Sequence, residues 1–163
     1  MIKSLIAITL LTLSFTANAF NLSEASKRHR EGVDQRLIDI SDLAIKISPV
    51  DFGHPRSAGI RTAKEQHELY KKGVSKADGY ISPSHHQSGR ALDFYAYVDG
   101  KASWDPKYLT AVAVAFMKAA ELLGHRIQWG GNFKTFRDLP HIQLAPEEYE
   151  LRRGLHKPRM AKR

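Results

Sequence analysis

Two short segments of this 163-residue chain place imidazoles and carboxylates beside turn-forming residues. The first, residues 84–93, has the sequence SHHQSGRALD, and the second, residues 138–141, has the sequence DLPH. A catalytic zinc ion needs three protein ligands with nitrogen or oxygen donors and one open coordination position. The chain contains no cysteine, so any metal ion must be held by His, Asp and Glu. The two segments therefore predict a metal site built from separate parts of the fold.

Local sequence narrows the choice of ligands in these segments. Gly89 and the apolar, aromatic run that follows it predict a loop turning into a strand that presents Asp93 inward. Adjacent residues entering a strand point to opposite sides, so only one of His85 and His86 can readily face a metal. His141 is expected to begin a later strand. On spacing alone, a chance arrangement in a chain with eight histidines remains an open alternative.

The other imidazoles of the chain have no partner at metal-ligand spacing. We expect them to be surface or capping side chains: His29, His54, His67, His125 and His156.

The start of the chain predicts export. Residues 1–3 include a lysine, residues 5–15 form an apolar run, and residues 17–19 have the sequence ANA. This order is typical of a secretory signal peptide, which we assign to residues 1–19 with cleavage before Phe20. The apolar run is shorter than the roughly 20 residues of a membrane-spanning helix. An exported protein without cysteine cannot use disulfides for stability.

The net charge of +8 comes mainly from one end of the chain. Residues 20–150, which we interpret as a single domain, carry 18 basic and 17 acidic side chains. Residues 151–163 carry six basic side chains and no acidic one. Such a basic C-terminal tail is either a solvated terminus or a weak contact with an anionic surface. The nearly neutral domain argues against nucleic-acid binding.

Hydrophobic periodicity and capping residues predict helices at residues 23–30, 33–47, 62–72, 106–123 and 146–152. Short strands are expected at residues 58–61, 92–98, 126–129 and 141–144, with Asp99 and Gly100 forming a hairpin turn. Residues 48–55 and 73–83 contain the Pro and Gly residues typical of loops. The chain shows no internal repeat and no second domain.

Three motifs resemble those of the M15 metallopeptidases: S-x-H-x-x-G-x-A-x-D at residues 84–93, W-G-G at residues 129–131 and D-x-P-H at residues 138–141. Within that family the chain is most similar to the L-alanyl-D-glutamate peptidases of phage endolysins and bacterial cell walls. The resemblance covers residues 22–144 and departs from the family pattern at Ile142 and at residues 54–56. It implies an α+β fold, a small antiparallel sheet with packed helices, as in Hedgehog and D-Ala-D-Ala peptidases.

The resemblance also implies the site residues. One Zn²⁺ per chain would be bound by His86, Asp93 and His141, which selects His86 over its neighbour His85. Asp138 matches the catalytic carboxylate of the family, which takes a proton from the attacking water and passes it to the leaving amine. The zinc ion lowers the pKa of that water.

Four further residues are expected around the metal. Arg61 is similar to an arginine that faces the active site, where it would polarise the scissile carbonyl or clamp a substrate carboxylate. Its alternative is a simple ion pair with an acid such as Glu65. Ser84 would bind substrate or orient a ligand, Gln66 would bind the peptide or stabilise a loop, and Trp129 would form a pocket wall or part of the core.

The implied activity is zinc-dependent hydrolysis of a peptidoglycan stem-peptide amide, by analogy the L-alanyl-D-glutamate bond. A D,D- or L,D-carboxypeptidase of the same family is the nearest alternative. A non-catalytic, zinc-stabilised binding module is the alternative from another class, although Asp138 and Arg61 argue against it because a structural site needs no base. The signal peptide and the single peptidase domain at residues 20–150 predict a monomer that acts in the periplasm of a Gram-negative cell.

Overall fold

The computed structural model describes residues 20–146. The predicted signal peptide at residues 1–19 and the basic tail at residues 151–163 lie outside the described residues, as does all but the first residue of the helix predicted at 146–152. Within the described part, no helix is both long and apolar enough to cross a bilayer.

The helices begin where capping side chains satisfy free backbone N–H groups. Asp34 accepts from the N–H of Arg36 at the start of one helix, and Thr62 and Glu65 form the predicted capping box at the start of another. The α-helices in residues 20–146 are α1 Glu24–Arg28, α2 Gln35–Ile47, α3 Ala63–Lys71 and α4 Pro106–Leu122. Two short 3₁₀ helices, η1 His85–Ser88 and η2 Gly130–Asn132, complete the helical segments there.

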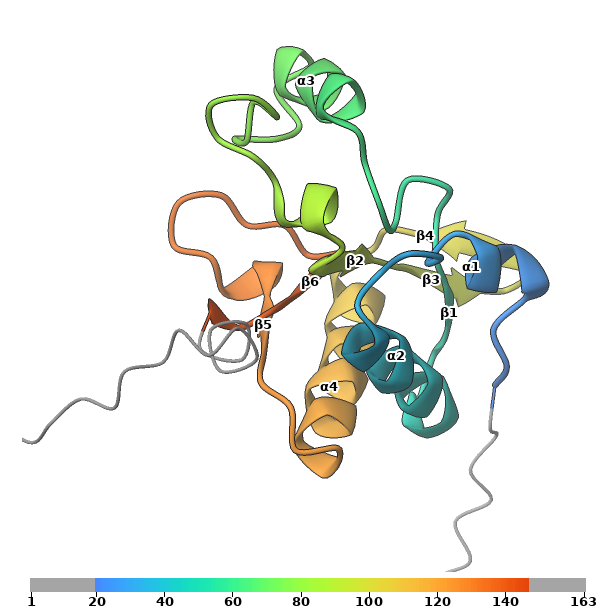
Figure 1. The fold of residues 1–163 in the computed structure, drawn as a ribbon. Coiled ribbons are helices and arrows are strands. Elements are labelled where there is room, and N and C mark those ends of the chain that lie inside the picture. The colour runs from blue at the N-terminus through green and yellow to red at the C-terminus, as the bar shows by residue number, and fades with distance from the viewer. Residues whose placement is uncertain (1–19, 147–163) are drawn as a thin grey trace, which may run out of the picture.

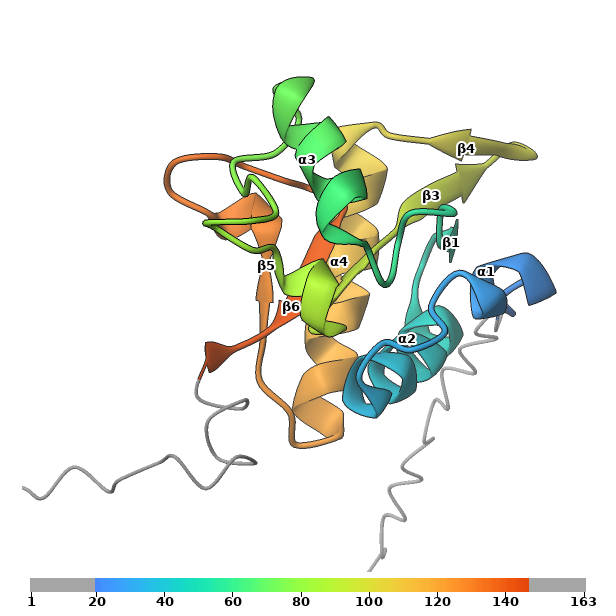
Figure 2. The ribbon, with the colours of Figure 1, turned by 45° about the horizontal axis from the view of Figure 1, so that its top comes forward.

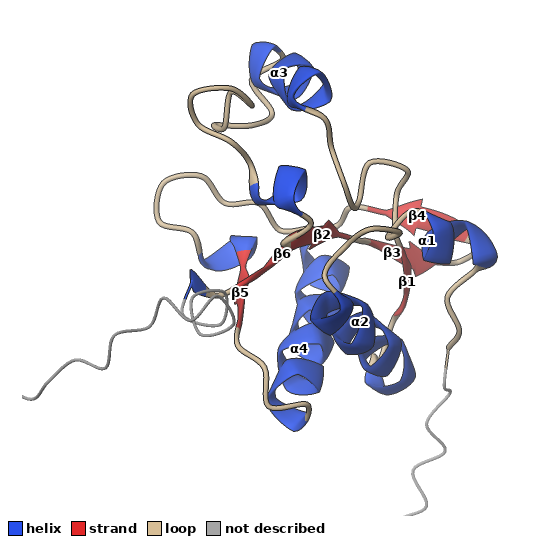
Figure 3. Ribbon diagram, viewed as in Figure 1, coloured by secondary structure: helices blue, strands red, loops and turns tan. Residues whose placement is uncertain are grey.

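The strands form two antiparallel sheets of three strands each. One sheet has the order β1-β3-β4, from β1 Asp51–Gly53, β3 Tyr95–Val98 and β4 Lys101–Ser103. The other has the order β2-β6-β5, from β2 Ala91–Asp93, β6 His141–Leu144 and β5 Ile127–Trp129. The predicted α+β class with small antiparallel sheets and packed helices is confirmed, as Figure 3 shows.

Two strand predictions differ from the structure. The strand predicted at residues 92–98 is interrupted at Phe94, whose N–H donates to the carbonyl of Pro140, so its halves join different sheets. The strand predicted at residues 58–61 is absent, because the carbonyls of Ala58 and Gly59 accept isolated hydrogen bonds from Asp93 and His86 instead of a ladder. A strand forms instead at β1, within the segment predicted as a loop.

The core lies between the sheets and the long helices. Helices α2 and α4 pack against each other on one side of the strands, whereas α3 and η1 lie on the other side (Figures 1 and 2). The paired residues Leu92 and Ile142 are fully buried, as are Phe94 and Phe116. Side chains alternate along a strand, so the neighbouring pair in this register must face away from that core.

Candidate metal centre

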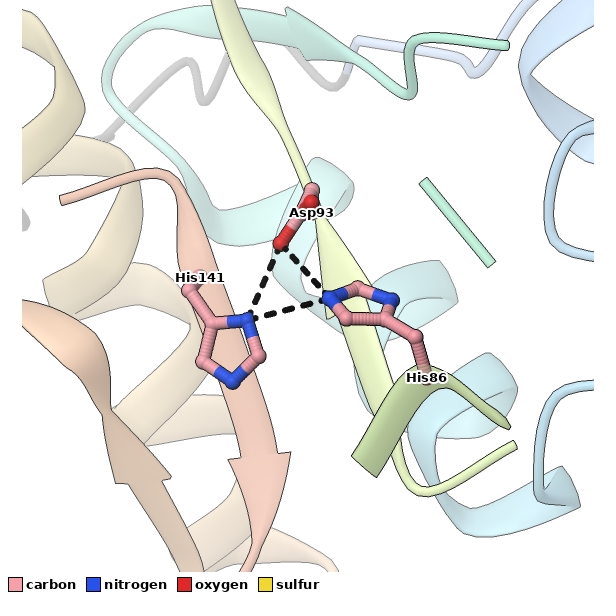
Figure 4. Close-up of side chains that lie close together, drawn as sticks. All are labelled: His86, Asp93 and His141. Carbon is pink, nitrogen blue, oxygen red and sulfur yellow. Dashed lines mark hydrogen bonds and ion pairs between the residues drawn. The ribbon is translucent and has the colours of Figure 1, made fainter. Parts of the chain in front are cut away.

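The pair that faces away from the core contains two of the predicted ligands. Asp93 of β2 lies opposite His141 of β6, and His86 reaches them from η1 (Figure 4). The Nε2 atom of His86 and the Nδ1 atom of His141 lie 3.3 and 3.1 Å from Oδ1 of Asp93. The two nitrogens are 3.2 Å apart. The structure therefore brings together three residues that come from two motifs far apart in the chain.

The 3₁₀ helix η1 holds His86 in place through its two ends. The hydroxyl of Ser84 accepts from the backbone N–H of His86, while the side chain of Gln87 accepts from the N–H of Ser84. At the other end Gly89 adopts a left-handed conformation, with φ of 67°, that turns the chain into β2. A side chain at that position would be strained and would also contact the carbonyl of Gly32 at 2.8 Å.

The far nitrogen of each imidazole has a hydrogen-bond acceptor. Nδ1 of His86 donates to the carbonyl of Gly59 over 2.9 Å, and Nε2 of His141 donates to the side-chain oxygen of Gln143 over 3.0 Å. The amide of Gln143 donates in turn to Gln128. These acceptors fix the orientation of both rings, so that the near nitrogens of His86 and His141 face Oδ1 of Asp93.

Asp93 is ionised in this setting. Burial acts to raise the pKa of its carboxyl, but the imidazoles of His86 and His141 outweigh burial and bring that pKa well below its usual value. Arg61 donates to the second carboxylate oxygen, Oδ2, and to the carbonyl of Ser57. The alternative considered for Arg61, an ion pair with an acid such as Glu65, occurs with Asp93 instead, whereas Glu65 caps α3.

This donor set fits a zinc ion. One ligand atom from each of His86, Asp93 and His141 lies within 4.8 Å of the others. Two imidazoles and one carboxylate are a ligand set of catalytic zinc sites, whereas Ca²⁺ and Mg²⁺ favour oxygen ligands. The hydrogen bonds to the far nitrogens supply the outer contacts that metal-bound histidines usually have.

Asp138 lies beside the three ligands without joining them. It lines a cleft of about 270 Å³ together with His86, His141 and Arg61. Burial raises the pKa of its carboxyl, and the negative charge of Asp93 raises it further. A carboxylate near a metal site but outside the ligand set can accept a proton from a reacting water. The position of Asp138 therefore suits a general base.

The other predicted site residues differ in whether they line the cleft. Ser84 lines the cleft and holds η1. Gln66 is fully buried and donates to Ser75 and to the carbonyl of Ala77, so it holds a loop. Trp129 does not line the cleft; it packs against the core and donates to the carbonyl of Leu139 over 2.7 Å.

His54 is a residue whose place the sequence did not reveal. It is buried rather than on the surface, and Nδ1 donates to the backbone carbonyl of Asp93 while Nε2 accepts from Ser41, both over 2.7 Å. Burial lowers the pKa of His54 to about 4, so the ring is neutral at neutral pH. His54 directly follows β1, two residues after the buried Phe52, and its contacts depend on Ser41 and Asp93 rather than on a local pattern.

Gly130 allows Asp138 and His141 to approach η2. A Cβ atom at Gly130 would overlap the carbonyl oxygen of Asp138 and lie 3.1 Å from Cβ of His141. We expect Gly130→Ala to displace the segment carrying both side chains and to lower both zinc affinity and peptidase activity by about tenfold or more, as loss of outer support does at metal sites. Zinc titration and hydrolysis assays measure the two effects.

Gly124→Ala is the matched control for Gly130→Ala. Gly124 follows α4 with φ of 71°, and a Cβ there meets open space. That variant should lose only the stability that a left-handed alanine costs, about 1 kcal/mol, and should bind zinc normally. Equal zinc affinity in the Gly130→Ala variant and the wild type would contradict the role assigned to this glycine.

Comparison with known proteins identifies the family that this chain matches. Residues 18–144 match the phage L-alanyl-D-glutamate peptidase family. The chain is 30% identical over 133 residues to the L-alanyl-D-glutamate peptidase of Escherichia phage T5, a match covering 81% of this chain and 94% of that protein. It is 34% identical over 99 residues to the peptidoglycan L-alanyl-D-glutamate endopeptidase CwlK of Bacillus subtilis, covering 54% of this chain and only 58% of CwlK.

A solved structure is similar over most of the described residues. The crystal structure of the Serratia marcescens L-Ala D-Glu endopeptidase ChiX superposes with a TM-score of 0.71 at 32% sequence identity. The similarity covers 83% of this chain and 97% of the ChiX chain.

Proposed function

The chain belongs to the phage L-alanyl-D-glutamate peptidase family, and on that premise we propose that it is a zinc-dependent endopeptidase that cleaves the L-alanyl-D-glutamate bond of peptidoglycan. The observation that carries the proposal is the convergence of His86, Asp93 and His141 beside Asp138 in one cleft. The choice of scissile bond is supported by the relatives, because CwlK, the phage T5 protein and ChiX are all named as peptidases of the L-alanyl-D-glutamate bond.

The ligands and the base divide the work of hydrolysis. His86, Asp93 and His141 would hold zinc, which when bound polarises a carbonyl and lowers the pKa of a water to about 7. Asp138 would take a proton from the attacking water and deliver it to the leaving amine. Arg61, which lines the cleft, would hold the Asp93 carboxylate and use its remaining N–H groups to polarise the scissile carbonyl.

The place of action follows from the substrate. Peptidoglycan lies outside the cytoplasm, and residues 1–19 have the pattern of a secretory signal peptide. We propose that the protein is exported, acts as a monomer in the periplasm of a Gram-negative cell and binds no nucleic acid. The basic segment at residues 151–163 would add at most a weak attraction to anionic surfaces.

Digestion of purified Gram-negative peptidoglycan by the protein from residue 20 onward tests this function. We expect mass analysis of the products to show new N-terminal D-glutamate, which should disappear when zinc is removed by a chelator. Release of terminal D-alanine alone would reassign the protein to the carboxypeptidases. Stoichiometric zinc binding without any product would instead favour the non-catalytic binding module.

A further inference from the structure

Two loops line the cleft that also contains His86, His141 and Asp138. Residues 74–77 follow α3, and residues 133–136 follow η2. Figures 1 and 2 show both loops on the same side of the molecule, away from α2. They meet at Lys76, whose Nζ atom lies 5.5 Å from the centre of the Phe136 ring. A cation over an aromatic ring is attracted to its face, so Phe136 restrains the direction of the ammonium group.

The backbone on both sides of Lys76 is also anchored. The buried amide of Gln66 donates to the hydroxyl of Ser75 over 2.7 Å and to the carbonyl of Ala77 over 3.0 Å. The hydroxyl of Ser75 also accepts from the N–H of Ala77. Residues 75 and 77 are therefore tied to α3, which presents the intervening lysine at the cleft in a defined position.

Lys76 is a cation of the cleft that no acidic side chain of the described residues neutralises. Arg61 and Lys76 are the lysine and arginine side chains among the described residues that line the cleft. Arg61 donates to the Asp93 carboxylate and the Ser57 carbonyl, and its remaining N–H groups are assigned above to the scissile carbonyl. Lys76 forms no ion pair with any acid in residues 20–146. An exposed cation beside a substrate cleft is suited to an anionic group of the substrate.

The substrate proposed above carries such a group next to the scissile bond. The amine of its D-glutamate belongs to the bond that is cut, and only one of its two carboxyl groups can continue the peptide. At least one carboxylate therefore stays free within a few bonds of the leaving amine. We propose that Lys76 binds this free carboxylate and makes the enzyme selective for an acidic residue on the leaving side. This inference rests on the proposed function and names a substrate contact for that site.

Two synthetic stem peptides that differ in one group test the role of Lys76. One carries the free glutamate carboxylate, and the other carries a carboxamide in its place. Wild-type protein with zinc should cleave the carboxylate peptide with a kcat/KM about tenfold higher, mainly through KM, as expected for a charge-assisted contact at a partly exposed site. Lys76→Met should lose this preference through a higher KM for the carboxylate peptide, and Lys76→Arg should largely restore it.

Lys134→Met is the matched control, because Lys134 is an exposed lysine of the other loop, residues 133–136, and does not line the cleft. It removes the same charge and should keep the preference. Equal cleavage of both peptides by the wild type, or an undiminished preference in Lys76→Met, would overturn the inference while leaving the proposed function intact. If the wild type cleaves neither peptide, nor intact peptidoglycan, the proposed function itself fails and the inference falls with it.

Discussion

Asp138→Asn is expected to lower kcat for stem-peptide cleavage by about 10²- to 10⁴-fold, the range for loss of a positioned acid–base group. Asparagine has nearly the same shape as aspartate but cannot accept and deliver the proton. The side chain lies in the cleft outside the ligand set, so zinc binding and the melting temperature should stay close to those of the wild type. Steady-state kinetics, zinc stoichiometry and thermal unfolding measure the three quantities.

The acidic limb of the pH profile gives a second readout of Asp138. Burial and the Asp93 charge raise the pKa of Asp138 in the metal-free protein, and the charge of bound zinc would act to lower it. Activity should fall as the pH drops through the pKa that Asp138 has beside zinc, and the residual activity of the asparagine variant should lack this step.

Asp99→Asn makes the same chemical change in the exposed turn between β3 and β4 and should leave activity unchanged. If Asp138→Asn keeps more than about a tenth of the wild-type kcat, which is far above the range for a lost general base, another group must carry the proton.

Removal of zinc by a chelator is expected to reduce cleavage by about 10³-fold or more, since a water without the metal keeps a pKa near 15.7. Adding one equivalent of zinc should restore activity. Zinc should also stabilise the fold by about 4 kcal/mol at a free concentration 1,000 times the dissociation constant, because the site exists only in the folded chain. Hydrolysis assays with and without zinc measure the first effect, and thermal unfolding under the same conditions measures the second.

The variant His86→Ala should show neither zinc-dependent activity nor the thermal shift, because it removes one of three ligands. His125→Ala, outside the cleft, is the matched control and should retain both. Full activity of the chelated wild type, verified to be metal-free, would contradict a metal-dependent reaction.

The ligand cluster could be predicted because its residues fall in short motifs that resemble those of a known family, whereas spacing alone left a chance arrangement open. His86 and Asp93 are separated by Gly89, and Asp138 precedes His141 by one short turn. The residues that orient these side chains were less visible. The carbonyl of Gly59 and the amide of Gln143 act through contacts that depend on how distant strands pair, and no local pattern marks them.

The helices could likewise be predicted from local residues, whereas the strands depend on distant ones. Helices α3 and α4 have their own start signals, Thr62 with Glu65 and Pro106, so their positions follow from neighbouring residues. Strands β1 and β2 have three residues each, too few for periodicity to identify. The break at Phe94 depends on Pro140, which is 46 positions away in the chain.

The pairing of β2 with β6 also determines which genetic changes this enzyme can tolerate. Leu92 and Ile142 fix the register on the core side, and the same register sets Asp93 opposite His141 on the other side. A one-residue insertion or deletion within either strand would exchange the two faces and bury a ligand in the core. We therefore expect length changes to be tolerated outside these two strands, for example in the loops that line the cleft, where they could alter substrate preference without moving the ligands.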